Sequence, residues 1–543
     1  MYECDVKVTQ FYTSSSTISL VMIFYFIAMQ ANLDSLSEWQ QFCKSVQNTS
    51  LDKTQQRIFL AAGLSIDLSA QRYSKEMEVA IERLLEARDF DNQRQALFDG
   101  DLINNTEHRA AWHVMLRNPQ PIVEVAEERK RVLEFVRRTD SDRRWRNIVH
   151  IGIGGSDWGV RLANSAFGYA GTWRNIRYVA NIDGHAIEAG LAGLDPRDTL
   201  IVVATKSFTT AETMANAQRA LAWLKAANIE NPYNQIIAVT AKPEMAEKWG
   251  VPKHNIFKFW DWVGGRFSLW SAVGVAAGLT VGSGVLAGLL SGAHAMDQHF
   301  YQTPIAENMP VQMAMSEIAN RSVLGYASRN LAVYDSRLAN LIPYLQQLEM
   351  ESLGKSVDKE GQDIVVPTGP VVWGMPGTDA QHTFFQWLHQ GTDGAPVDFI
   401  VCEQEDHRWE EHHRQLLAHC LAQREALLNG KTEAEAYTEN IAAGMEESKA
   451  RMLAKHRKQP EGRPSNLIVL PRLTPFSLGA LLALYEHKVF VEGLVWGLNP
   501  FDQWGVELGK ILAKGLDKEL SCDCQINATH LPSTKYWIEK LRK

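Results

Sequence analysis

A cluster of hydroxyl groups beside one lysine is the clearest chemical feature of the sequence. Thr205, Lys206, Ser207, Thr209 and Thr210 directly follow the apolar run Leu200–Ala204 and open a helical pattern. Backbone N–H groups at a helix start attract anions, and the hydroxyls and the ammonium add further donors. Thr209 with Glu212 also fits a capping box, so one threonine has a purely structural alternative. A cap needs one hydroxyl, however, and the turn offers four, which favours a phosphate site.

A glycine-rich turn follows another apolar run, Ile148–Ile151. The segment Gly152–Gly159 carries Gly155 and Ser156 and could bring backbone N–H groups close to a phosphate. It is not a dinucleotide fingerprint, because Asp157 stands where the third glycine should be. The alternative is an ordinary tight strand-to-helix turn. Together with the hydroxyl cluster, the turn favours a sugar monophosphate over a nucleotide as ligand.

Two further segments carry charges suited to proton transfer. Arg266 follows Gly264 and Gly265 in the segment 261–268, where it could stabilise a developing negative charge or simply pair with a structural carboxylate. Glu349 and Glu351 are two residues apart on a predicted helix. They therefore point to different sides, so at most one faces a pocket. A lone helical glutamate is otherwise usually a solvated surface residue.

The last two candidate segments lie toward the C-terminus. A glycine-rich turn, Gly374–His382, brings His382 into a predicted helix, with His389 as a rival and a structural role as the alternative. Gln503 and Lys510 are seven residues apart, so a continuous helix would place them on one face. The alternative for that pair is a polar stripe on a solvated helix. We interpret His487 and Lys488, just upstream, as surface residues.

Short apolar runs alternate with helical patterns through most of the chain and predict an α/β fold with two parallel sheets, each covered by helices on both faces. The region 29–119 is predicted to be helical. A stretch without charged side chains, Ser268–Met296, is predicted to be a buried, glycine-rich helical region joining the two sheets, with a membrane helix as the alternative. The predicted strands are Ile148–Ile151, Tyr178–Ala180, Leu200–Ala204, Ile236–Val239, Ile256–Phe259, Leu331–Tyr334, Val371–Trp373, Val397–Val401 and Leu467–Leu470.

Composition narrows the class of protein. The 543 residues predict more than one domain, and 45% hydrophobic with 22% charged residues is ordinary for a globular protein. A net charge of -8 disfavours nucleic acid and membrane surfaces as partners. Six scattered cysteines do not form a disulfide framework, and the pair Cys522 and Cys524 lacks zinc-site spacing. We therefore expect a cytoplasmic protein without a bound metal, with residues 1–28 as an extension outside the fold.

Together and in this order, the segments closely resemble the glucose-6-phosphate isomerase family. Asp261–Ser268 and Gly493–Lys510 resemble its two signature regions, and Gly152–Gly159, Thr205–Thr210, Met350–Lys355 and Gly374–His382 match it as well. The sequence departs from the family's usual pattern at Leu348-Glu349, where Gly-Asp is commoner. The resemblance runs from about Asp67 to Lys510.

The resemblance implies two three-layer α/β/α sugar-isomerase (SIS) domains with helical N- and C-terminal arms. The domains expected are 29–119 (helical), 120–290 and 291–505 (sugar-isomerase), and 506–543 (helical arm). It also implies a homodimer with active sites at the subunit interface and no cofactor. The implied reaction converts glucose 6-phosphate into fructose 6-phosphate through ring opening and a cis-enediolate, in glycolysis and gluconeogenesis.

The same resemblance implies a role for each site residue. Glu351 is expected to be the general base and Arg266 the group that stabilises the enediolate. His382, from the partner subunit, and Lys510 are expected to assist ring opening. The substrate-binding residues implied are Gly155, Ser156, Thr205, Lys206, Ser207, Thr210, Gly265, Gln347 and Gln503. A non-catalytic sugar-phosphate sensor on the same fold is the main alternative, and it could dispense with Glu351, Arg266 and His382, all of which are present.

Overall fold

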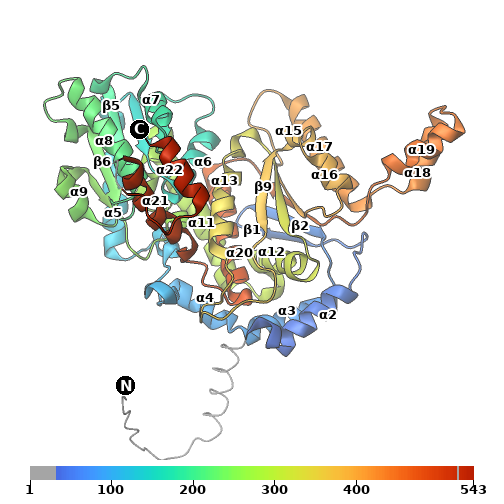
Figure 1. Ribbon diagram of the computed structural model, residues 1–543. Helices are drawn as coiled ribbons and strands as arrows, with labels where there is room; N and C mark the ends of the chain where they lie inside the picture. Colours follow the sequence, from blue (N-terminus) through green and yellow to red (C-terminus); the bar gives the residue numbers. More distant parts are fainter. Residues whose placement is uncertain (1–31, 522–524, 543) are drawn as a thin grey trace, which may run out of the picture.

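The computed structural model describes residues 32–521 and 525–542. The expected extension over residues 1–28 lies outside the described residues, as do Cys522 and Cys524. Two β-sheets, each accompanied by helices, form two lobes, and long helices lie between them (Figure 1). The predicted α/β fold with two sheets is therefore confirmed.

The first sheet is parallel and has the order β4-β3-β5-β6-β7. Every residue of β5 is buried, as expected for a strand covered on both faces. Successive β5 residues enter different cores: Leu200 and Val202 lie in the large central core, Ile201 and Val203 in a second core under α8. All five predicted strands are confirmed: β3 (Asn147–Ile151), β4 (Asn175–Val179), β5 (Thr199–Ala204), β6 (Ile236–Thr240) and β7 (Ile256–Lys258). The helices around them are α5 (Val123–Asp142), α6 (Trp158–Phe167), α7 (Gly184–Leu191), α8 (Ala211–Ala226) and α9 (Pro243–Trp249).

The second sheet is mixed, with the order β1-β2-β11-β10-β8-β9. Its parallel strands β8 (Ser328–Tyr334), β9 (Val371–Pro376), β10 (Val397–Cys402) and β11 (Ser465–Leu470) are the predicted ones. The antiparallel hairpin β1 (Ile58–Ala61) and β2 (Leu64–Ala70) was not predicted, and the expectation of helix throughout 29–119 is wrong there. Alternate β2 residues are buried, a two-residue period typical of a strand with one face on the core. The helices beside this sheet are α12 (Met309–Ile318), α13 (Leu341–Leu345), α14 (Glu351–Leu353), α15 (Gly377–Gln381), α16 (Phe385–Gln390) and α17 (Glu410–Asn429).

The glycine-rich stretch Ser268–Met296 forms part of the core between the sheets, as predicted. It contains α10 (Val275–Val281) and most of α11 (Ser283–Gln302), which packs along α20 (Pro475–Trp496). A Cβ on Gly292 would lie 1.8 Å from the Phe476 carbonyl oxygen, and one on Gly479 would lie 2.1 Å from the Leu289 carbonyl oxygen. The glycines therefore let two backbones approach closely. In the part of the chain that the structure describes, no helix is long and apolar enough to cross a membrane.

Helix α20 is buried on almost every side, although it carries four acidic or basic residues. Glu486, His487, Lys488 and Glu492 are each at most 1% exposed. Our interpretation of His487 and Lys488 as surface residues is therefore wrong. The helix is buried all round, and these side chains find partners inside the core: Arg117 for Glu486, Asp297 for His487, and Glu349 and Glu492 for Lys488.

The remaining helices lie at the periphery. Helices α2 (Ser37–Asn48), α3 (Lys75–Ala87) and α4 (Phe90–Asp99) run along one side, and the pair α18 (Glu433–Ala442) and α19 (Glu447–Arg457) projects away from the second lobe (Figure 1). The chain closes with α21 (Glu507–Ser521) and α22 (Pro532–Leu541). No residue of α21 is buried, and its apolar side chains Leu508, Ile511 and Leu512 are 50–68% exposed.

Candidate active site

Two glycine-rich turns meet at the carboxyl edge of the first sheet. The turn after β3 packs so tightly on the turn before Arg266 that a Cβ on Gly155 would lie 2.1 Å from the Gly265 carbonyl carbon. Ser268 Oγ donates to the Gly155 carbonyl at 3.2 Å. Gly154 has a left-handed φ of 58° and faces the Gln347 amide across the turn. The structure therefore brings the Gly152–Gly159 turn and the Arg266 segment together, next to Gln347. Ser156, half-buried, ends the short helix η4 (Gly154–Ser156) in the same turn.

Arg266 is fixed by acceptors from two distant parts of the chain. Its side chain is 2% exposed. Its Nε donates to Ser352 Oγ at 2.7 Å and its Nη1 to Gln503 Oε1 at 3.0 Å. Its Nη2 donates to the carbonyls of Pro500 and Asp502 at 2.6 and 3.0 Å. Burial lowers the pKa of Arg266, and the nearby Glu351 and Asp502 carboxylates only partly offset that effect.

Glu351 stands beside this guanidinium. One carboxylate oxygen, Oε2, lies 3.4 Å from Arg266 Nη1 and accepts a hydrogen bond from Gln347 Nε2 at 3.0 Å. Its side chain is 23% exposed, whereas Glu349 is fully buried and turned the other way, toward Arg329 and Lys488. The prediction that only one of the two carboxylates faces a pocket is thus consistent with the contacts. A base candidate, a cation and two amides form one cluster.

The hydroxyl-rich turn follows β5 at the same edge of the sheet. Thr205 is buried, and its hydroxyl lies 2.8 Å from that of Thr210, the residue before α8. Ser207 and Thr209 are exposed and bonded to each other at 2.7 Å. The alternative of a capping role for Thr209 is not realised, because its hydroxyl donates to Ser207 Oγ and the helix has no side-chain cap. The buried Phe208 holds a left-handed φ of 53°, which folds the turn back on itself.

Lys206 connects the hydroxyl-rich turn to the Arg266 turn. Its Nζ donates to the Asp261 and Val263 carbonyls at 2.7 and 3.0 Å. Burial first, and then the charge of Arg109, lowers its pKa to about 8. With Gly265 and Gln503 it lines a cavity of about 50 Å³. The sequence predicts that the Lys206 ammonium binds a phosphate, but nothing in it indicates the two carbonyl partners.

His382 and Lys510 lie apart from this cluster within one chain. His382 is exposed just after α15, and Lys510 is 63% exposed on α21, 2.7 Å from Glu507. Among residues 32–521 and 525–542, no hydrogen bond or ion pair joins either side chain to Glu351, Arg266 or Gln503. The expectation that Gln503 and Lys510 share a helix face is wrong, because α21 begins only at Glu507 and Gln503 lies in the preceding loop, bonded to Arg266.

Lys355 and Asp502, which were not selected from the sequence, hold the loop that carries Gln503. Lys355 Nζ lies 3.0 Å from both the carbonyl and Oδ1 of Asp502, and it also donates to the Asn499 carbonyl. The other oxygen of Asp502, Oδ2, accepts from Thr106 Oγ1 and Asn499 Nδ2. In the sequence, Lys355 stands out only as the end of the matched segment Met350–Lys355. No regular spacing links these residues, so only their place in matched segments could have indicated them.

Comparison with known proteins agrees with this geometry. A model of the phosphoglucose isomerase family matches residues 67–538, which include every candidate residue named above. The chain belongs to the phosphoglucose isomerase family. The glucose-6-phosphate isomerase of Bordetella pertussis is 52% identical over 519 residues, covering 95% of this chain and all of that protein. The Caulobacter vibrioides protein of the same name is 42% identical over 501 residues, covering 89% and 92% of the two chains.

A solved structure of a glucose-6-phosphate isomerase from Chlamydia trachomatis superposes with a TM-score of 0.81 at 28% identity, covering 94% of this chain and 99% of the other. Membership of the phosphoglucose isomerase family therefore rests on sequence over most of the chain and is matched by the fold.

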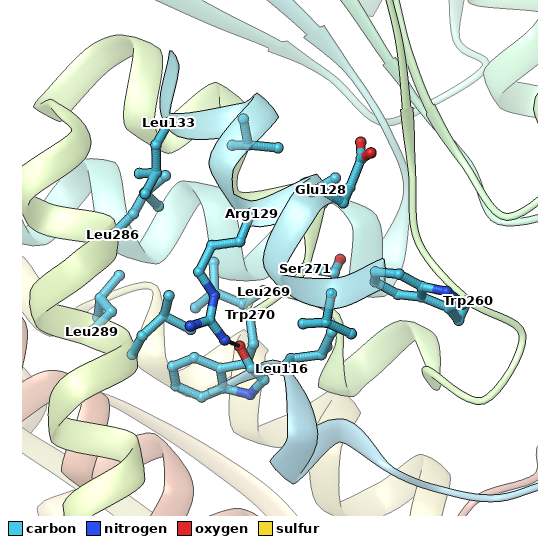
Figure 2. A pocket seen from close by; sticks show the side chains of 14 residues that line it. Leu116, Glu128, Arg129, Leu133, Trp260, Leu269, Trp270, Ser271, Leu286 and Leu289 are labelled. Atoms are coloured by element: carbon cyan, nitrogen blue, oxygen red, sulfur yellow. Dashed lines mark hydrogen bonds between the residues drawn. The ribbon is translucent and has the colours of Figure 1, made fainter. Parts of the chain in front are cut away.

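A second cavity does not suit the sugar phosphates of this family. It measures about 40 Å³ and lies between α5 and α11, among the side chains of Leu133, Leu286 and Leu289 (Figure 2). Its guanidinium, Arg129, donates to the Leu116 and Asn118 carbonyls at 2.7 and 3.0 Å. A phosphorylated sugar needs many convergent polar groups, and this lining is mainly aliphatic and aromatic. In the described residues, no group of three or more His, Cys, Asp or Glu side chains could hold a metal ion.

Proposed function

We propose that this protein interconverts glucose 6-phosphate and fructose 6-phosphate. The observation that carries the proposal is the pairing of Glu351 with the buried Arg266, at a point where segments of both lobes meet beside the Thr205–Thr210 turn. The curated relatives with 42–52% identity are glucose-6-phosphate isomerases. The protein would then act in glycolysis and gluconeogenesis, in the cytoplasm.

Substrate binding starts at the phosphate. The hydroxyls of Ser156, Thr205, Ser207 and Thr210, the Lys206 ammonium and backbone N–H groups of the turns hold the dianion. Gly155 and Gly265 let the backbone approach the sugar because neither has a side chain. Binding the phosphate, which does not react, supplies energy that positions the reacting carbons.

The chemical step moves the carbon-bound proton from C2 to C1 and shifts the carbonyl from C1 to C2. Glu351 removes the proton from C2 of the open-chain aldose while the C1 carbonyl becomes an enediolate oxygen. Arg266 stabilises that anion, and Gln347 and Gln503 orient the sugar. Glu351 then returns that proton to C1, while the proton of the C2 hydroxyl passes to the oxygen on C1 and the carbonyl forms at C2. Carbon skeleton and oxidation state are conserved overall, so the step consumes no reductant or oxidant.

Ring opening requires an acid and a base near the sugar, and within one chain the two candidate groups, His382 and Lys510, lie apart from Glu351. We assign this step to Lys510 and to His382 of a second subunit, because His382 is exposed and lies apart from Glu351 in its own chain. The exposed apolar side chains of α21 support an interface with another copy. The active unit would be a homodimer, with each site built from two chains.

The decisive test replaces the proposed base. Purified, metal-chelated protein is incubated with fructose 6-phosphate and the formation of glucose 6-phosphate is followed. Glu351→Gln keeps the size of the side chain but cannot accept a proton, so kcat should fall at least ~100-fold. KM should change little, because the phosphate turn is intact. The control is Glu188→Gln, an exposed carboxylate on α7. Normal turnover in Glu351→Gln would refute the assignment.

A further inference from the structure

The turn that carries Glu351 is not an ordinary α-helix. Helix α13 widens at Leu345 into a π-helical turn, η13 (Gln346–Met350), and returns to α-helical geometry at α14. Such turns are rare and often occur at functional sites. This one supplies Gln347 from within and Glu351 from its end, and the two side chains are hydrogen bonded. A widened turn can shift by rotation, so something must fix it.

Glu349 is the residue in this turn that reaches into the core. Its side chain is 0% exposed and bonded to Arg329 of β8 through both carboxylate oxygens. Lys488 of α20 donates to its Oε2 at 3.1 Å. Burial alone would favour the neutral acid, but the two cations outweigh it and lower the pKa of Glu349. The carboxylate therefore ties the turn to a strand and to the central helix.

The side chains of Glu349 and Glu351 face in opposite directions. Residues two apart on a helix point to opposite sides, so anchoring Glu349 in the core fixes the direction in which Glu351 projects. We propose that Glu349 is a positioning residue: its buried ion pairs with Arg329 and Lys488 hold the π-helical turn that presents Gln347 and Glu351 to the substrate. This inference rests on the proposed role of Glu351 as the base.

The chain offers a matched control in the same cluster. Glu317 also contacts Arg329, with Oε2 3.1 Å from Nε, and is equally buried. It lies on α12, which carries none of the proposed site residues. Burial raises the pKa of Glu317, so a neutral glutamine is a mild replacement there. The two carboxylates share one arginine, and only one of them holds the Glu351 turn.

The experiment compares three variants in the fructose 6-phosphate assay and by thermal unfolding. Glu349→Gln should lower kcat about 10- to 100-fold, since a displacement near 1 Å has that order of effect, with KM within about threefold of wild type. Glu317→Gln should keep kcat within about twofold. The double variant Glu349→Gln/Lys488→Met also removes the Lys488 ammonium, which in the single variant is left with Glu492 at 2.7 Å, a buried carboxyl whose pKa is raised to about 8 and which can stay neutral. It should recover much of any lost Tm while kcat stays low.

The results separate positioning from simple stability. A kcat for Glu349→Gln equal to that of Glu317→Gln overturns the proposal, and so does recovery of kcat together with Tm in the double variant. If the single variant does not fold, the double variant decides the question by the same criterion. An active Glu351→Gln would instead overturn the proposed function. An inactive Glu351→Gln beside a normal Glu349→Gln would remove only this inference.

Discussion

Replacing Gly155 by alanine should displace Arg266, which is proposed to stabilise the enediolate, through its backbone and not through its side chain. The added Cβ would lie 2.1 Å from the carbonyl carbon of Gly265, 2.2 Å from its oxygen and 2.6 Å from the Arg266 nitrogen. All three are backbone atoms, so no side chain can rotate away to make room. The two turns must therefore separate, and the Arg266 turn moves away from the Glu351 carboxylate.

The size of the effect follows from the overlap. Carbon atoms in contact lie about 3.5–4.0 Å apart, so the turns must separate by more than ~1 Å. A misplacement of about 1 Å costs on the order of 100-fold in rate, or roughly 2.7 kcal/mol of transition-state stabilisation. We expect kcat/KM of Gly155→Ala to fall by about that factor. Overpacking of a rigid region should also lower stability by about 1–3 kcal/mol.

The assay is the conversion of fructose 6-phosphate, with thermal unfolding measured in parallel. Gly284→Ala is the matched control, because a Cβ there meets no atom within 4 Å on helix α11. The control should keep wild-type activity and gain slightly in stability, as glycine-to-alanine changes in helices usually do. Wild-type kcat/KM in Gly155→Ala would show that the two turns are not rigidly packed, and the argument would fail.

Two predictions concern stability. Gly292→Ala places a Cβ 1.8 Å from the Phe476 carbonyl oxygen, so α11 and α20 must separate and urea unfolding should show a loss of about 1–3 kcal/mol, absent in Gly284→Ala. Burial, only partly offset by Lys488 at 2.7 Å, raises the pKa of Glu492 to about 8. Between pH 4.5 and 8 the folded protein therefore keeps a proton that the unfolded chain loses, and stability falls as pH rises through this window. Glutamine at position 492 cannot titrate, so Glu492→Gln should lack this loss of stability. In urea unfolding, the free energy of unfolding of the variant minus that of wild type should increase by up to a few kcal/mol from pH 4.5 to pH 8. An equal difference at both pH values would contradict the assignment.

The parallel strands could be predicted from the sequence because each is a short, continuous apolar run. Such a run is typical of a strand that is buried on both faces, and β5 is the clearest case. The hairpin of β1 and β2 was missed because β2 alternates: Leu64, Ile66 and Leu68 are buried and the residues between them are polar. Its role as an added antiparallel edge depends on β11, which lies far away in the sequence.

The contacts among the candidate site residues could not be predicted from the sequence. Arg266, Glu351 and Gln503 were singled out separately, yet nothing in their spacing indicates that one guanidinium contacts both of the others. The charges of α20 were misplaced for a related reason. Charged side chains are almost always exposed unless paired. One partner of Lys488, Glu492, lies one turn further along α20, but the other, Glu349, lies in a distant element that the sequence does not connect to the helix.

The acceptors around Arg266 explain how a buried arginine could serve the proposed reaction. Four neutral acceptors surround its donors: the Ser352 hydroxyl, the Gln503 amide and the backbone carbonyls of Pro500 and Asp502. They satisfy its hydrogen bonds but leave its charge largely uncancelled. The carboxylate paired with it is that of Glu351, at 3.4 Å.

In the proposed reaction, the negative charge disappears from the Glu351 carboxylate as it accepts the proton from C2, and a new one develops on the enediolate. The positive charge of Arg266 stays in place. It first stabilises the Glu351 carboxylate and then the enediolate, so the protein does not have to move. A second structural carboxylate bonded to Arg266 would cancel this effect. The preference for carbonyl and hydroxyl acceptors is therefore what the proposed mechanism requires of this position.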